Sequence, residues 1–153
     1  MPVDKLRTYL DSNNVKYNSI PHVTSYTALQ TAHSAHISGR RFAKPVMVKV
    51  EGKLCMVVIP ANEKLDLRCL QRVTHARSVE LAREEDFKHL FPDCEVGAEP
   101  PLGNLYGLPV FISRSLAVDE NIAFNAGTHD ELIEIPYQAY EKLVSPQAIP
   151  YPV

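Results

Sequence analysis

The chain has 153 residues, 45% hydrophobic and 22% charged, which is enough for one well-buried core, so we expect a single domain over residues 1–153. No apolar run approaches the roughly 18 residues of a membrane span, and the first residues lack a secretory signal, which argues against a membrane partner and predicts a cytoplasmic protein. The net charge of −2 conceals a basic half, residues 1–77 with 12 basic and 5 acidic side chains, and an acidic half, residues 78–153 with 4 and 13.

The first elements are predicted from hydrophobic spacing. A helix is expected over about residues 3–11, followed by a short extended segment over 17–20. A second helix follows, for which Thr24 or Ser25 is the expected N-cap and Gly39 the expected end.

The clearest strand signal is a pair of valine-rich segments, Val46–Val50 and Leu54–Ile59, joined by Glu51-Gly52-Lys53. The runs of β-branched residues and the short polar link that contains glycine predict a β-hairpin.

The second half of the chain alternates short helices and strands. Asp66 is placed to cap a helix. The elements expected after it are a strand near 78–81, a helix over 84–90, strands near 108–113, 122–125 and 131–135, a helix over 136–143 and a loosely held tail over 145–153. Hairpins with interspersed helices predict the α+β class, with a mixed, mainly antiparallel, barrel-like sheet surrounded by helices.

Lys44 is unusual because strand alternation places its side chain on the same face as Val46, Val48 and Val50. An unpaired buried ammonium is costly, which favours a position at the rim of a pocket that holds water or a polar ligand. A lysine at the start of a strand can equally extend to solvent, and the residue alone supports both interpretations. Lys49 falls on the opposite face, where a solvated lysine is ordinary.

Two loops carry polar groups that a core does not require. Glycine at positions 97 and 103 permits close approach of a ligand, and the prolines between them stiffen the first loop. The second loop is Asn125-Ala126-Gly127-Thr128-His129. Each is also typical of an ordinary surface turn or hairpin connection, and composition by itself favours that simpler interpretation.

Basic residues gather around the predicted hairpin and the helix after it. Arg40 and Arg41 precede the first strand, while Arg68 and Arg72 share one face of the helix because they are four residues apart. Such clusters attract phosphates. The alternative is that the acidic half folds back and neutralises them, and sequence alone favours this alternative modestly.

Several chemistries are disfavoured. His33 and His36 lie on one helix without further ligands at metal-binding spacing, so no metal site is predicted. A Gly-x-Ser-x-Gly nucleophile motif and a phosphate-binding P-loop are absent from the sequence. Cys55 lies within an apolar strand and is expected to be buried, which makes it a poor nucleophile.

The order of these features resembles the YbaK/ProX family of freestanding aminoacyl-tRNA deacylases, which are similar to the editing domain of bacterial prolyl-tRNA synthetases. The resemblance spans nearly the whole chain. The features that carry it are Thr27-Ala28, Gly39, Lys44, Val58-Ile59-Pro60, Leu65-Asp66-Leu67, Gly97 to Gly103 and Gly127-Thr128-His129.

The resemblance implies a trans-editing deacylase that hydrolyses the ester of a mischarged tRNA, notably proline tRNA carrying cysteine or alanine, with no cofactor. Its partners are then the aminoacylated acceptor end of a tRNA and, in some settings, an aminoacyl-tRNA synthetase. Lys44 and His129 match catalytic positions, and the substrate-binding positions are Gly97, Pro101, Gly103, Gly127 and Thr128. The acceptor stem is expected to meet Arg40, Arg41, Arg68 and Arg72.

One departure from the family affects this expectation. Pro45 follows the lysine where relatives carry asparagine or threonine, so a side-chain donor is lost and the amino-acid preference is open. At the first position of a strand, proline leaves the fold intact. A non-catalytic module that binds an amino acid, a nucleotide or a tRNA is therefore the alternative, and a regulatory protein that docks through its basic half is a second one.

If the protein is a deacylase, we expect Lys44 to contact the ester or the terminal ribose and phosphate. Backbone N–H groups near Gly127 or Gly103 are expected to stabilise the oxyanion, and His129 to position the substrate.

Overall fold

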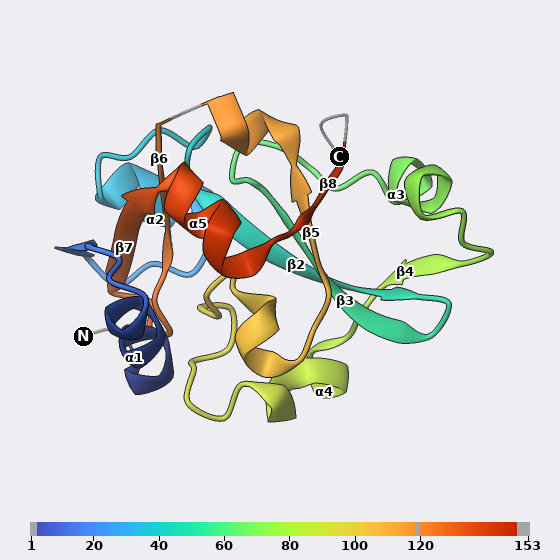
Figure 1. Cartoon of the computed structure of the whole chain (residues 1–153), viewed down its shortest axis with the longest axis horizontal. Helices are drawn as coiled ribbons and strands as arrows, with labels where there is room; N and C mark the ends of the chain where they lie inside the picture. Colours follow the sequence, from blue (N-terminus) through green and yellow to red (C-terminus); the bar gives the residue numbers. More distant parts are fainter. Residues whose placement is uncertain (1–2, 119, 150–153) are drawn as a thin grey trace.

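The protein, seen as a computed structural model that describes residues 3–118 and 120–149, combines two β-sheets with surrounding helices (Figure 1). The elements of the first half are α1 (Asp4–Ser12), β1 (Asn18–Pro21), α2 (Ala28–Ser34), β2 (Ala43–Val50), β3 (Lys53–Pro60) and α3 (Leu67–Thr74). Those of the second half are β4 (Val79–Leu81), α4 (Glu84–Phe87), η1 (Lys88–Leu90), η2 (Gly103–Tyr106), β5 (Val110–Ser113), η3 (Arg114–Val118), β6 (Asn121–Asn125), β7 (Glu131–Pro136), α5 (Tyr137–Val144) and β8 (Gln147–Ile149). None of the described helices is long and apolar enough to cross a membrane.

The larger sheet has the strand order β4-β2-β3-β5-β8 and the smaller one the order β1-β7-β6. Most pairings are antiparallel, but β5 lies parallel to both β3 and β8. This confirms the predicted α+β class and the mixed, mainly antiparallel pairing. Between the two sheets, the described residues form one isolated bridge, from Phe42 to Ala123, so the strand ladders do not close into a barrel.

The hairpin of β2 and β3 is confirmed and fixes the register of the larger sheet. Glu51 and Gly52 form its two-residue turn, with φ of 49° and 79°, the left-handed backbone that a type I′ turn requires. Val50 and Lys53, which flank the turn, form a hydrogen-bonded pair. Counting back along β2 from Val50, every second residue as far as Lys44 therefore directs its backbone N–H and C=O to β3. Pro45 and Met47 then direct their backbone groups to the opposite side, as the bond from Ala82 N to Met47 O shows.

This register explains Pro45, which is the third residue of β2 rather than the first. Its nitrogen, which lacks a proton, faces the side away from β3. On that side β4 pairs only with residues 48–50, so no ladder bond is lost. The edge of β2 at Pro45 is therefore open.

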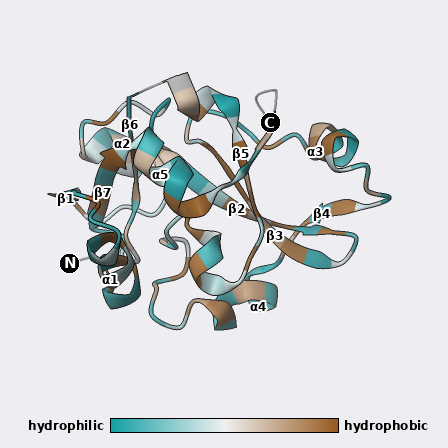
Figure 2. Cartoon of the chain, in the orientation of Figure 1, coloured by the Kyte–Doolittle hydropathy of each residue, from teal (hydrophilic) through white to brown (hydrophobic). Residues whose placement is uncertain are grey.

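The core has two layers, one on each face of the larger sheet. On one face, Val48 packs with Val57 and with Leu70 of α3. On the other, Met47 and Met56 belong to the largest cluster, to which α1, α5 and the smaller sheet contribute. Figure 2 shows hydrophobic residues along β3 and β5, whereas α5 carries both hydrophilic and hydrophobic residues.

The limits of α2 differ from the prediction. Its N-cap is Thr27, whose Oγ1 accepts a hydrogen bond from Gln30 N at 3.1 Å, rather than Thr24 or Ser25. The helix ends at Ser34, because His36 takes a left-handed backbone with φ of 57°, before Gly39 is reached. The segment between Pro21 and Thr27 instead runs beside the smaller sheet, where Ser25 N donates to His129 O at 3.1 Å.

The expectation of a loosely held tail is wrong for residues 147–149. They form β8, which pairs in parallel with β5 at the edge of the larger sheet. Ile149 is fully buried in the cluster on the α3 side. Residues 150–153 of the predicted tail lie outside the described part of the chain.

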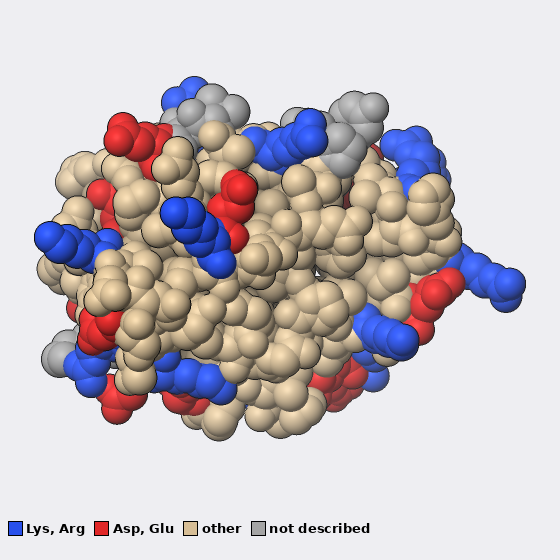
Figure 3. Space-filling view, viewed as in Figure 1, with Lys and Arg blue, Asp and Glu red and all other residues tan. Residues whose placement is uncertain are grey.

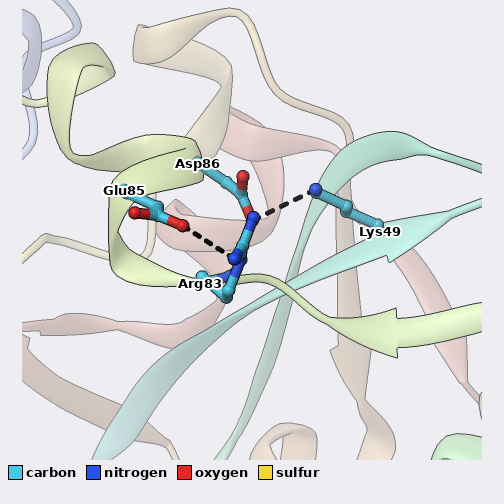
Figure 4. Close-up of polar contacts among 4 residues, drawn as sticks. All are labelled: Lys49, Arg83, Glu85 and Asp86. Carbon is cyan, nitrogen blue, oxygen red and sulfur yellow. Dashed lines mark hydrogen bonds and ion pairs between the residues drawn. The ribbon is translucent and has the colours of Figure 1, made fainter.

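Ion pairs join the basic and the acidic halves of the sequence. Lys49 of β2 is not simply solvated, because its Nζ lies 3.1 Å from Asp86 of α4, which Arg83 also approaches (Figure 4). Arg41 pairs with Glu134 of β7. The N–H of Arg83 and the ammonium of Lys49 lower the pKa of Asp86. The pairs Lys49–Asp86 and Arg41–Glu134 confirm, for these residues, the predicted folding of the acidic half onto the basic half. The pair of Lys49 and Asp86 joins α4 to β2.

Candidate functional site

Two loops that are distant in the sequence lie side by side in the structure. Glu95 N donates to Gly127 O at 2.8 Å, and Gly127 N donates to Ala98 O at 2.9 Å. The carboxylate of Glu95 also accepts a hydrogen bond from His129 N at 2.9 Å. The fold therefore joins the two loops that the sequence singled out. The N–H of Gly127 itself is donated to Ala98 within the fold, so it is already engaged in this arrangement.

His129 occupies the junction between the loops. Its side chain is buried, and its Nε2 lies 2.6 Å from Val96 O. A carbonyl only accepts, so this contact requires the proton on Nε2 and leaves Nδ1 as an acceptor in the neutral ring. The Cε1 atom of His129 lies 3.3 Å from where a Cβ at position 97 would stand, and Gly97 has a φ of +86°. The glycine thus permits the histidine to approach the backbone of this loop.

An aromatic residue that the sequence did not indicate covers His129. The ring of Tyr26 lies 4.7 Å from the imidazole, centroid to centroid, and 73% of Tyr26 is exposed. The residue sits in an irregular segment with no periodicity, so only the folding of that segment over the second loop identifies it.

Pro101 and Gly103 lie in the core beneath the loop. Pro101 O accepts a hydrogen bond from Tyr140 Oη at 2.6 Å. A Cβ on Gly103 would stand 2.9 Å from a methyl carbon of Val110, so the chain passes against β5 at this point. These contacts anchor the end of the loop in the core. Thr128 is half-buried and donates to Asp130 at 2.7 Å.

Lys44 is half-buried at the start of β2, on the same face as Val48, as the alternation predicted. Its Nζ lies 3.5 Å from Ala61 O, which is the long limit of a hydrogen bond. Burial lowers the pKa of the amine, an effect that the nearby Glu63 carboxylate partly offsets. The amine is therefore partly desolvated, and it bonds to Ala61 rather than to either loop.

A cavity of about 290 Å³ lies beside the open edge of β2. Glu99, which the sequence analysis did not single out, is the one titratable group among its lining residues, all of which belong to the described chain. The lining residues are Pro45, Val46, Met47, Leu81, Ala82, Phe87, Val96, Gly97 and Glu99. Lys44, which precedes Pro45, lies on the other face of β2 and is not one of the residues that line the cavity.

Other predicted residues lie apart from this cavity. Figure 1 places α3, with Arg68 and Arg72, at the opposite end of the molecule from α2, which Arg40 and Arg41 follow. On the face shown in Figure 3, basic side chains alternate with acidic ones rather than forming one patch. The four arginines therefore do not form a single cluster. Cys55 is buried as predicted, and burial raises the pKa of its thiol.

Comparison of the sequence with known families agrees with this arrangement. Residues 22–143 match the aminoacyl-tRNA editing domain, which covers well over half of the chain, both loops and Lys44. The chain therefore belongs to the aminoacyl-tRNA editing domain family, and the resemblance noted in the sequence is confirmed. A comparison with curated protein sequences finds no match.

Solved structures share the fold at low sequence identity. A hypothetical protein, APE2540, superimposes with a TM-score of 0.83 at 18% identity, over 95% of this chain and 97% of that one. A candidate trans-editing enzyme for prolyl tRNA synthetase gives 0.82 at 18% identity, over 97% and 95%. A candidate signal transduction protein from Marinobacter aquaeolei VT8 gives 0.76 at 16% identity, over 97% of this chain but 30% of that one.

Proposed function

We propose that the protein is an aminoacyl-tRNA deacylase that acts in trans on the ester of a mischarged tRNA. The observation that carries this proposal is the match to the editing domain, because it includes Lys44, the loop of Gly97 and the loop of His129. An aminoacyl ester is already activated, so the protein need only orient water and stabilise the oxyanion. In the reaction, water adds to the ester carbonyl, the bond to the ribose oxygen breaks, and that oxygen takes up a proton.

Lys44 is the residue that we assign to the reacting group. Its ammonium has one long hydrogen bond and is partly desolvated, so its remaining protons are available to a negative oxygen. Because Gly127 N–H is already donated within the fold, a larger share of oxyanion stabilisation falls to this lysine. His129 is assigned a positioning role, since its Nε2 is held by Val96 O while Gly97 and Gly127 shape the backbone around it.

The size of the cavity supports a small amino acid as the substrate moiety. At about 290 Å³ it lies at the lower end of the roughly 300–1,000 Å³ typical of ligand pockets. Its walls are mostly apolar side chains. We propose proline tRNA carrying cysteine or alanine as the substrate, and we place the acyl group in the cavity and the terminal adenosine towards Tyr26.

The second candidate function is a binding module that recognises the aminoacyl group without hydrolysing it, alone or with a synthetase. Pro45 and the engaged N–H of Gly127 favour it, because each removes a donor from the site. The occurrence of the same fold as 30% of a candidate signal transduction protein also supports this alternative.

A panel of mischarged tRNAs separates the two functions. We expect the protein to release alanine or cysteine from proline tRNA at least about 10-fold faster than it releases proline. A binding module is expected to slow spontaneous hydrolysis of the ester instead. Protection of every ester in the panel would rule out the deacylase.

The arginines of α3 are proposed to meet the phosphates of the tRNA. We expect the double substitution Arg68→Ala and Arg72→Ala to weaken tRNA binding and to reduce the slope of log affinity against log salt by about 1–2, because each lost phosphate contact contributes about 0.7–0.9. The matched control is Arg114→Ala, another exposed arginine. An unchanged salt slope in the double variant would place the tRNA elsewhere on the surface.

A further inference from the structure

The cavity beside β2 contains a buried acid that the deacylation mechanism does not use. Glu99 is 7% exposed and lies in the loop between Gly97 and Gly103. Burial raises the pKa of Glu99, while the N–H of Gly97 and the charge of His129 act in the opposite direction. A carboxylate in such a position costs stability relative to an apolar residue, which makes a functional role worth testing.

The internal contacts of Glu99 leave part of its hydrogen-bonding capacity open. Both carboxylate oxygens accept from Gly97 N, at 3.1 and 2.9 Å, and the backbone N–H of Glu99 itself also stabilises the carboxylate. A carboxylate offers about four lone-pair sites, so two backbone N–H groups leave acceptor positions for a ligand. Glu99 is one of the residues that line the cavity.

The other residues that line the cavity indicate the chemistry of the rest of a ligand whose positive group binds Glu99. Pro45, Met47, Leu81 and Phe87 are apolar, and the volume is about 290 Å³. One anionic group in a small apolar cavity is complementary to a compact cation that carries a short apolar side chain. An α-amino acid esterified through its carboxyl group has this composition, because its carboxylate charge is lost and its ammonium remains.

We propose that the Glu99 carboxylate binds the α-ammonium of the aminoacyl group and thereby selects aminoacyl esters over acyl groups that lack a positive charge. This inference rests on the proposed function for the placement of the acyl group in the cavity. It assigns to Glu99 a role in substrate recognition rather than in the attack on the ester.

The test compares two stable probes that differ at one group. Alanine and lactic acid are each joined by an amide to 3′-amino-3′-deoxyadenosine, so that one probe carries an ammonium and the other a hydroxyl at the same carbon. By isothermal titration calorimetry with the full chain, we expect the alanyl probe to bind about 10- to 100-fold more tightly than the lactyl probe, the range of a charge-assisted hydrogen bond.

Glu99→Gln removes the charge but keeps a carbonyl acceptor for Gly97 N. We expect this variant to bind both probes with affinities equal to within about 3-fold, and Glu80→Gln, an exposed acid outside the cavity lining, to keep the wild-type preference. If Glu99 serves only to hold the loop, Glu99→Gln keeps the preference, and the proposal fails. It also fails if the wild-type protein binds the probes equally or binds neither, and this wild-type comparison decides even if the variant does not fold.

The outcome is separable from that of the deacylase proposal. Hydrolysis of mischarged tRNA without a preference for the ammonium overturns the role of Glu99 alone. A preference for the alanyl probe in a protein that hydrolyses no ester overturns the deacylase and leaves ammonium recognition standing.

Discussion

Lys44→Ala is expected to lower the rate of deacylation by about 100- to 1,000-fold, the effect of losing one oxyanion donor, or about 2.7–4 kcal/mol. The reason is that the Lys44 amine is partly buried at the start of β2, makes a long hydrogen bond to Ala61 O, and is the group that we assign to the developing oxyanion. Single-turnover hydrolysis of alanine from proline tRNA measures this effect without interference from product release.

The loss must be shown to arise from chemistry rather than from unfolding. Because burial lowers the pKa of Lys44, the folded state disfavours its ammonium relative to the unfolded chain. This cost is fully present below the lowered pKa and falls away as the pH rises from there to the pKa of the unfolded chain. We therefore expect Lys44→Ala to keep the thermal midpoint of the wild type within about 3 °C at neutral pH. Lys64→Ala, which removes an exposed lysine, is the matched control and should retain full activity. A Lys44→Ala enzyme with near-normal turnover would remove the lysine from the mechanism.

Gly127→Ala is expected to lower the free energy of unfolding by about 2–6 kcal/mol. Gly127 has a φ of +103°, and a side chain with this backbone costs about 1–3 kcal/mol. A Cβ would also stand 2.3 Å from Cγ1 of Val3, and such overpacking costs a further 1–3 kcal/mol or so. Urea denaturation monitored by circular dichroism measures the loss. Because the Gly127 loop carries His129, deacylation should fall as well.

Two further variants separate the backbone effect from the clash. Gly52→Ala has a similar φ, +79°, but nothing lies within 4 Å of the added Cβ, so it should cost only the backbone strain. Combining Val3→Ala with Gly127→Ala should restore the part of the stability lost to the clash, after correction for Val3→Ala alone. If Gly127→Ala costs no more than Gly52→Ala, the close packing of residue 3 against this loop is not present in solution.

The parts of the fold that were predicted correctly depend on contacts between residues close in the chain. Glu51-Gly52 supplies the left-handed backbone of the hairpin, and Asp66 accepts hydrogen bonds from Arg68 N and Cys69 N at the start of α3. The alternation along β2 likewise placed Lys44 on the face of Val48. Each of these features follows from local backbone geometry, which neighbouring residues determine.

The errors share a different cause. Thr27 rather than Thr24 caps α2, because the segment before it is held against the second loop through Ser25 N. The tail becomes a strand only because the edge of β5 is available to it. The distance between the two arginine pairs is likewise a tertiary property, because the long hairpin between them carries α3, with Arg68 and Arg72, to the far end of the molecule from α2 (Figure 1).

The sequence by itself determined the class of fold, the hairpin and the two glycine-containing loops, since turn chemistry and side-chain periodicity are local properties. Only the tertiary structure decided that these loops bond to each other, that Pro45 faces an open strand edge and that Glu99 lines an otherwise apolar cavity. The physical reason is that burial and charge complementarity depend on which distant segments meet. A glutamate between glycines and prolines has no periodicity from which its surroundings can be predicted.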